Sequence, residues 1–124
     1  MAKSLTKAMP QEIEVWFVIP AVRRELAKSF LSKGRSQKEA ADLLGISEAA
    51  ISQYLSDKRG NELQFDAAEK KKISETADNI LKGGHLMQEM HRLVVNLRAA
   101  TSVCKMHKKM DKGLPHDCKI CLEG

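Results

Sequence analysis

Aromatic residues are scarce in this chain of 124 residues, which contains three Phe, one Tyr and one Trp. Proteins that bind single-stranded nucleic acid stack bases on rows of aromatic side chains, and the sequence has no such row. The chain also lacks an apolar run of about 18 residues, which a membrane-spanning helix needs. Its first residues, 1–14, lack the apolar core and small-residue cleavage site of a secretory signal. We therefore expect a cytoplasmic protein with no membrane partner.

Cysteine is also rare, and three cysteines cannot all pair within one chain. In a reducing compartment their presence favours metal binding over disulfides. Lysine and arginine number 21 against 16 acidic residues, giving a net charge of +5 and a pI of about 9.2. This moderate excess suits a polyanionic partner, and the lack of stacking residues makes duplex DNA the favoured one. A chain of this length forms one domain, or one domain with a small appendage.

The most informative segment, residues 36–60, reads SQKEAADLLGISEAAISQYLSDKRG and predicts two short helices joined by a glycine turn. Ser36 and Glu39 have the spacing of a capping box, which begins a helix. Gly45 lies where a left-handed backbone can end that helix without a side-chain clash. Ser47 is a favourable N-cap for the second helix.

This segment resembles the helix-turn-helix of the phage-repressor-like (XRE-type) family, with Ala41 as the small residue at the helix crossing, Gly45 at the turn and Ile51 as the inward anchor. In that family the second helix, here residues 47–56, enters the major groove of DNA. The resemblance implies that the base edges are read by Ser47, Glu48, Ala49 and Gln53. It places near the DNA phosphates Gln37, Ser56, Lys58 and Arg59.

Glu48 has two interpretations that the sequence leaves open. In the groove its carboxylate is repelled by phosphates unless it accepts a hydrogen bond from a cytosine amino group, which would make it a specificity residue. In the first turn of any helix, a Glu also favours the positive end of the helix dipole. More broadly, residues 36–60 can be read as an ordinary pair of helices used only for packing or protein contacts, as in an interaction adaptor.

The stretch before this motif predicts a helix that begins near Pro10 and kinks or restarts at Pro20, because proline lacks an N–H and restricts the preceding residue. After Pro20, apolar residues recur at intervals of four and predict a helix with the inward face Val22, Leu26 and Phe30. The alternative is a strand over residues 13–18, given their Val and Ile content. We prefer the helix because no partner strand is visible in the sequence.

Two further helices are predicted after the motif. Asp66 and Glu69 form a second capping signature, and the helix they open ends at Gly83–Gly84. The next helix, ending near Val103, has an apolar stripe formed by Leu86, Met87, Met90, Leu93, Val94 and Leu97. This stripe either folds back on the first domain or meets its counterpart in a homodimer through residues 85–103. We favour the homodimer, because helix-turn-helix regulators usually read paired half-sites.

The C-terminal tail carries two close pairs of metal-binding residues in a C-x2-H-x10-C-x2-C arrangement: Cys104, His107, Cys118 and Cys121. Thiolate and imidazole ligands in two pairs predict a tetrahedral zinc site. The alternatives are an iron–sulfur cluster, His116 in place of His107 as the fourth ligand, and a tail with free thiols. Cys104 and His107 as a catalytic pair would also need an orienting group and an oxyanion site, which the sequence does not offer. We therefore do not expect the protein to be an enzyme.

Three segments together, EVWFVIPAVRRELAKSF, ISEAAISQYLSDKRG and the terminal CKMHKKM with CKIC, resemble a family of small archaeal predicted transcriptional regulators. The expected fold is all-α, with five or six helices and an irregular C-terminal metal-binding tail. Its expected domains are residues 10–82, which bind DNA through the helix-turn-helix, and residues 85–124, which hold an amphipathic helix and the Cys/His tail. The expected function is sequence-specific regulation of transcription; the sequence does not indicate a small-molecule effector.

Overall fold

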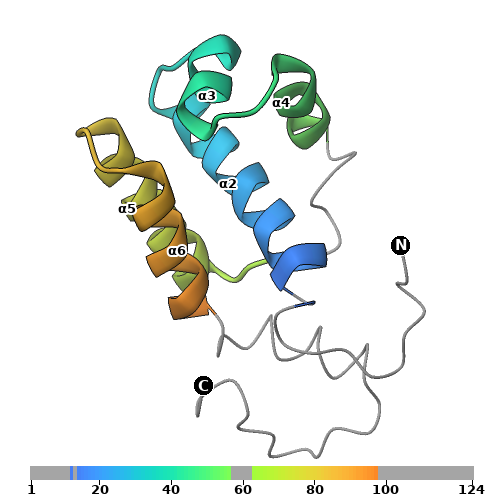
Figure 1. Ribbon diagram of the computed structural model, residues 1–124, viewed down its shortest axis with the longest axis vertical. Helices are drawn as coiled ribbons and strands as arrows, with labels where there is room; N and C mark the ends of the chain where they lie inside the picture. The colour runs from blue at the N-terminus through green and yellow to red at the C-terminus, as the bar shows by residue number, and fades with distance from the viewer. Residues whose placement is uncertain (1–11, 13, 57–62, 98–124) are drawn as a thin grey trace, which may run out of the picture.

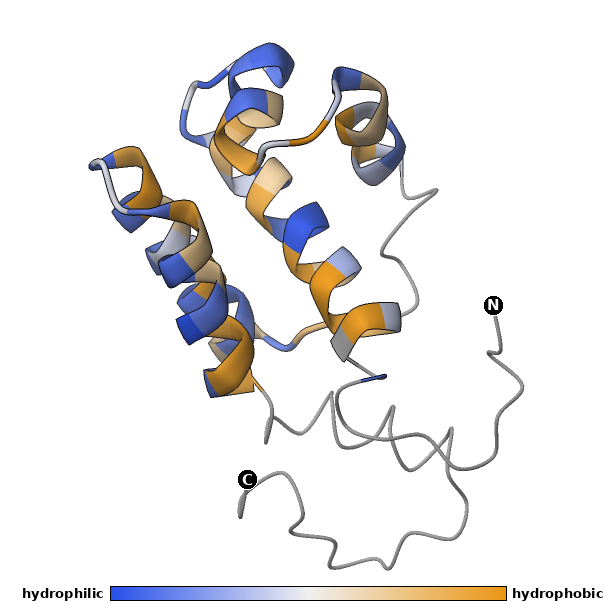
Figure 2. Cartoon of the chain, in the orientation of Figure 1, coloured by the Kyte–Doolittle hydropathy of each residue, from blue (hydrophilic) through white to orange (hydrophobic). Residues whose placement is uncertain are grey.

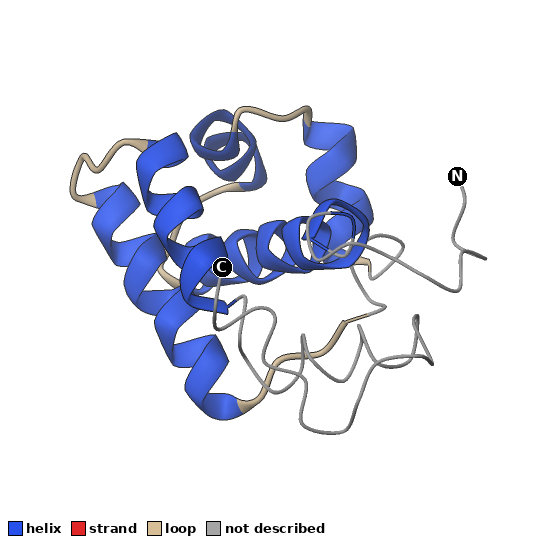
Figure 3. Ribbon diagram, turned by 60° about the horizontal axis from the view of Figure 1, so that its bottom comes forward, coloured by secondary structure: helices blue, strands red, loops and turns tan. Residues whose placement is uncertain are grey.

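The computed structural model describes residue 12 and residues 14–56 and 63–97, and every regular element in these ranges is a helix (Figure 1). The elements are η1 (Glu14–Val18), α2 (Ile19–Ser32), α3 (Gln37–Leu44), α4 (Glu48–Leu55), α5 (Ala67–Leu81) and α6 (Leu86–Leu97). A second view of the same part of the chain shows helices and loops without a strand (Figure 3). The all-α prediction is therefore confirmed for the described residues. The predicted irregular tail lies outside them.

Pro20 shapes the entry into the fold. Residues 14–18 form a π-helical turn that runs directly into α2, with Pro20 in the first turn of α2. Proline has no N–H to give to residue 16, and its ring clashes with the carbonyl of that residue, so the backbone widens before it. The predicted restart at Pro20 is confirmed. The strand considered for residues 13–18 is wrong for residues 14–18, the part of it that the structure describes.

The core is organised around α2, which contacts η1, α3, α4 and α5. Its apolar face is fully buried, as its four-residue spacing predicted, with Val22, Leu26 and Phe30 among the least exposed residues described. Figure 2 shows hydrophobic residues concentrated along α2 and hydrophilic ones on the outer turns of the surrounding helices. The central helix thereby supports both the α3–α4 pair and the α5–α6 pair.

Capping boxes begin α3 and α5 at the predicted residues. The Ser36 hydroxyl accepts from the Glu39 N–H at 3.1 Å, and the Glu39 carboxylate accepts from the Ser36 N–H at 3.3 Å. At α5, the Asp66 carboxylate accepts from the Glu69 N–H, and the Glu69 carboxylate from the Asp66 N–H, each at 2.8 Å. Each box satisfies donors that a helix leaves unpaired at its first turn.

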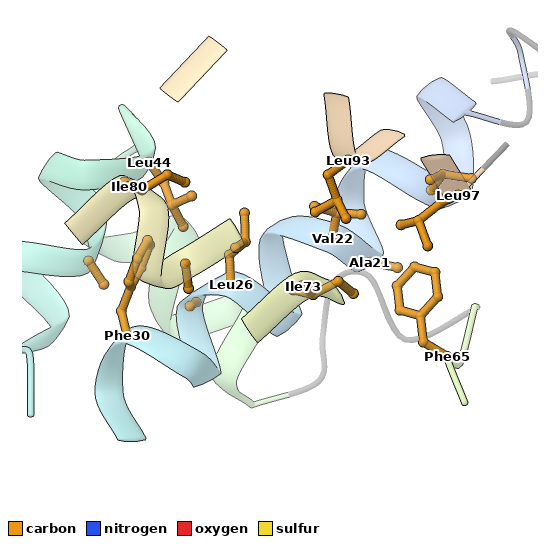
Figure 4. Close-up of a cluster of buried hydrophobic side chains, with 14 of the residues drawn as sticks. Ala21, Val22, Leu26, Phe30, Leu44, Phe65, Ile73, Ile80, Leu93 and Leu97 are labelled. Carbon is orange, nitrogen blue, oxygen red and sulfur yellow. The ribbon is translucent and has the colours of Figure 1, made fainter. Parts of the chain in front are cut away.

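The apolar stripe of α6 folds back on the same chain, which was the alternative to its use in a homodimer. Leu93, Val94 and Leu97 are buried. In Figure 4, Leu93 and Leu97 extend toward Val22 and Ala21 of α2. The large hydrophobic residues that α6 leaves exposed are Met87 and Val95. None of the described helices has the length and apolar character needed to cross a membrane.

Candidate nucleic-acid interface

Gly45 makes the turn between α3 and α4. Its backbone is left-handed, with φ of +66°, a conformation that side chains other than glycine rarely adopt. The Gly45 N–H donates to the Asp42 carbonyl at 3.2 Å, and the Ile46 N–H donates to the Ala41 carbonyl at 3.0 Å. These two bonds satisfy carbonyls at the end of α3 and fix the short connection, residues 45–47, from which α4 starts.

The inner face of α4 is fixed by a cap and by apolar burial. The Ser47 hydroxyl accepts from the Ala50 N–H at 3.1 Å, which confirms the predicted N-cap. Ile51 is fully buried and belongs to the core cluster, as expected of the inward anchor, and Tyr54 beside it is 4% exposed. Ala40 and Ala41 of α3 are also buried, and their small size permits close helix approach.

The outer face of α4 is polar and open at the N-terminal end of the helix. Ser47, Glu48 and Ala49, three of the four predicted base readers, are all exposed there, and Ser52 continues the same face. The first N–H groups of a helix lack intrahelical acceptors, so this end offers backbone donors in addition to side chains. The geometry brings these three predicted readers together at one exposed helix end.

Gln53, the fourth predicted base reader, differs from the other three. A base reader has to face outward, whereas the Gln53 side chain is half-buried. Its Oε1 is shielded from solvent and has no hydrogen-bond partner among the described residues. A glutamine reads adenine by presenting both amide atoms. Gln53 would therefore have to turn its amide outward before it could make that bidentate contact.

The predicted phosphate contacts fall on two sides of the turn. Gln37 is exposed in the first turn of α3. Ser56 is exposed at the end of α4, where its hydroxyl donates to the Gln53 carbonyl at 3.2 Å. The two cations of this set, Lys58 and Arg59, lie outside the described residues.

The two helices and the turn of this motif carry a negative net charge. Residues 36–56 contain Lys38 against the three carboxylates of Glu39, Asp42 and Glu48. Glu39 is held by its own cap: the Ser36 N–H, followed by the Arg35 guanidinium at 3.3 Å, keeps the pKa of this carboxyl below its usual value. This segment therefore offers phosphates little net attraction, and the cations have to come from the flanking residues.

A buried arginine was not predicted from the sequence. Arg24 is 2% exposed in α2, and its guanidinium donates to Glu25 Oε2 at 3.1 Å and to Gln64 Oε1 at 3.1 Å. The second bond ties the segment before α5 back to the central helix. No periodicity marks a buried arginine, so this link had no signal in the sequence.

The predicted metal ligands Cys104, His107, Cys118 and Cys121 lie outside the described residues. Within the described ranges, no group of three or more His, Cys, Asp or Glu side chains has an arrangement that could hold a metal ion. His85 and His91 are both exposed.

Comparison with known proteins identifies one part of the chain. No curated protein and no solved structure matches the chain. A family model described as Helix-turn-helix matches residues 25–60, which begin in α2 and include α3, the Gly45 turn and α4. Residues 25–60 are thus similar to a helix-turn-helix, and the caps and the turn described above lie within this segment.

Proposed function

We propose that this protein is a sequence-specific regulator of transcription that binds duplex DNA and reads the major groove with residues 47–56. The observation that carries the proposal is the exposed N-terminal end of α4, held by the Ser47 cap and the buried Ile51. A rigid helix with an open polar end is what the groove admits, and the family match to residues 25–60 supports this use.

Four residues are proposed to contact base edges: Ser47, Glu48, Ala49 and Gln53. The Ser47 oxygen accepts the capping bond, and its hydroxyl proton remains free to donate to a base. Glu48 can only accept when ionised, which suits the amino group of cytosine. Ala49 offers an apolar contact of the kind that thymine methyl groups make.

Four residues are proposed to contact the DNA backbone: Gln37, Ser56, Lys58 and Arg59. Only the last two carry charge, and backbone contacts of this kind set the register of the protein rather than its sequence preference. Each neutralised phosphate contributes about −0.9 to the slope of log affinity against log salt. Two cations per chain give an expected slope of about −2 for one chain and about −4 for a pair of chains on two half-sites.

A salt series on duplex DNA tests this proposal. Genomic fragments bound in cells are recovered first, because they supply the operator sequence. Affinity for that operator is then measured from low to physiological salt, beside a duplex of scrambled sequence. The proposal expects a preference for the operator at every salt concentration and a slope close to the values above. Absence of duplex binding at low salt would contradict it.

The second candidate is a protein-interaction adaptor that uses the same open helix face. The observation that favours it is the acidic balance of residues 36–56, which suits a basic protein partner better than a phosphate backbone. The same salt series separates the two functions, because an adaptor shows no affinity for duplex DNA at low salt.

Two further features belong to the proposal. We propose a homodimer through residues 85–103, since paired half-sites need two reading helices. The inner side of α6 is buried in the chain itself, so the outer side around Val95 and the residues after Leu97 are what a second copy would use. We also propose zinc, with an iron–sulfur cluster as the alternative, on Cys104, His107, Cys118 and Cys121.

A further inference from the structure

A groove of about 360 Å³ runs between the start of α2, the end of α3 and α6. Ile19 and Arg23 of α2, Leu44 of α3 and Met87, Met90 and His91 of α6 are among the residues that line it. Small-molecule sites are typically concave, mainly apolar and supplied with a few polar groups, and they start at about 300 Å³. The volume and lining of this groove therefore fit a small ligand with an apolar body.

The polar part of the groove is cationic. Arg23 is half-buried, and no ion pair joins it to another described residue, whereas its neighbour Arg24 is paired with Glu25 at 3.0 Å. The described lining contains no carboxylate, and the His91 imidazole adds further nitrogen atoms to it. A half-buried guanidinium without a carboxylate partner is poised to bind an anion, because its fork of N–H donors matches carboxylate geometry.

We propose that this groove is a binding site for a small amphipathic carboxylate, whose anionic group pairs with Arg23 and whose apolar tail lies along Leu44, Met87 and Met90. Methionine suits such a site, because its unbranched, polarizable side chain adapts to tails of different shape. Met87 is 74% exposed, so the outer wall is free to fold over a bound tail.

The groove is also joined to the DNA-reading part of the chain. Leu44 is the last residue of α3, and Leu86 Cδ2 lies 4.0 Å from the position that a Cβ on Gly45 would occupy. A ligand between α3 and α6 thus contacts the turn that sets the start of α4. By linkage, a ligand that favours one placement of this turn changes DNA affinity by the same factor as DNA changes ligand affinity. This second step rests on the proposed DNA binding.

Octanoate is the probe for the site, with octanol as the uncharged counterpart. Binding is followed through the methyl resonances of Leu44, Met87 and Met90 on the full chain. We expect octanoate to shift these resonances selectively and to bind at least about tenfold more tightly than octanol. Arg23→Gln should remove that difference between the two probes.

Two more variants make the result decisive. Met87→Glu should weaken octanoate binding, because the new carboxylate on the exposed wall of the groove repels the carboxylate of octanoate. The substitution does not disturb the core, since Met87 is exposed. Arg92→Gln removes a cation from the side of α6 away from the groove, where Arg92 pairs with Glu89 at 3.0 Å, and should leave octanoate affinity unchanged. Unchanged methyl resonances, or equal octanoate affinity in the Arg23→Gln variant, would overturn the proposal.

A second copy of the chain is the competing occupant. Sedimentation of the same samples would overturn the proposal if it showed a dimer that Met87→Glu dissociates and that octanoate does not affect. In the absence of DNA, a change in the amide resonances of Gly45 and Ile46 on adding octanoate shows that the site is linked to the turn. The site is therefore tested whether or not the chain binds DNA. A change in duplex affinity on adding octanoate, measured separately, then tests the second step.

Discussion

Glu48 is the single residue whose chemistry most restricts the DNA that this chain can bind. It is an exposed carboxylate in the first turn of α4, on a segment that is already acidic. We predict that Glu48→Gln raises affinity for all duplexes, because a repulsion from the phosphates is removed. It should also relax the preference at one cytosine position by roughly 1–3 kcal/mol, measured by competition between operator variants.

Glu75 provides the charge-matched control for this experiment, since it is exposed on α5 rather than on α4. Glu75→Gln changes the net charge by the same amount and should raise affinity only slightly, with the ranking of operator variants intact. If Glu48→Gln behaved like Glu75→Gln, the carboxylate would be serving only the dipole of its own helix.

Glu39 gives a second prediction at the scale of one residue. Its folded-state pKa lies below the usual value because the Ser36 N–H, and then the Arg35 guanidinium, favour the ionised form. The stabilisation is therefore present at neutral pH and is lost as the pH falls through this lowered pKa. We predict that Glu39→Gln lowers stability at pH 7 and that the difference from the unmodified chain is lost as the pH falls through the lowered pKa of Glu39.

Denaturant unfolding at a series of pH values measures this difference. Asp42→Asn is the control, because Asp42 is an exposed carboxylate on the same helix that takes no part in the capping box. A difference between Glu39→Gln and the unmodified chain that stayed constant across the acid range would mean that the charge on Glu39 does not contribute to the cap.

At the scale of elements, the connection between α5 and α6 depends on a close backbone approach at Gly84. The Gly84 N–H donates to the Asn79 carbonyl at 2.9 Å, and a Cβ on Gly84 would lie 2.7 Å from that same oxygen. We predict that Gly84→Ala destabilises the fold by about 1–3 kcal/mol, because the backbone must shift and strain or lose this bond. Thermal and denaturant unfolding measure the loss.

Lys82→Ala is the matched control in the same connection, since Lys82 is exposed and its change adds no atom near Asn79. It should alter stability by well under 1 kcal/mol. Equal effects of the two substitutions would contradict the close-approach explanation.

The helix starts were predictable because capping is local. Ser36, Ser47 and Asp66 each cap the helix that their sequence spacing indicated, and Gly45 turns where it was expected. The partner of an apolar stripe, by contrast, is not set by local sequence. The periodicity of α6 predicts that one face is buried, but it does not predict against what. Leu93 and Leu97 pack within the chain because α2 lies beside them. The burial of Arg24 and of the Gln53 side-chain oxygen also depends on residues that are distant in the sequence.

For the whole molecule, the packing of α6 changes how a homodimer can be tested. Leu93 is 3% exposed in the core, so Leu93→Glu buries a charge and should unfold the chain rather than produce folded monomers. Val95 is 42% exposed on the outer side of the same helix. We predict that sedimentation of the unmodified chain gives a dimer and that Val95→Glu gives folded monomers with weaker operator binding. A monomer at micromolar concentration before any substitution would contradict the proposed dimer.

The last prediction concerns the proposed metal on Cys104, His107, Cys118 and Cys121 and its relation to the rest of the molecule. The described helices have a core of their own around α2. A structural zinc site needs deprotonated ligands, so acid or a strong chelator should release the ion and leave the helix-turn-helix folded. We predict about one zinc per chain by elemental analysis of protein purified without oxygen.

Circular dichroism before and after chelation separates the two parts, because loss of the ion should leave most of the helical signal and its cooperative melting in place. Stoichiometric iron with acid-labile sulfide would favour the iron–sulfur alternative, and DNA affinity should then depend on the oxidation state of the cluster. Freely reactive thiols on all three cysteines and no bound metal would contradict both. Loss of the helical fold on chelation would instead mean that the core of α2, α5 and α6 is not stable without the metal. The free energy of metal binding would then contribute directly to folding.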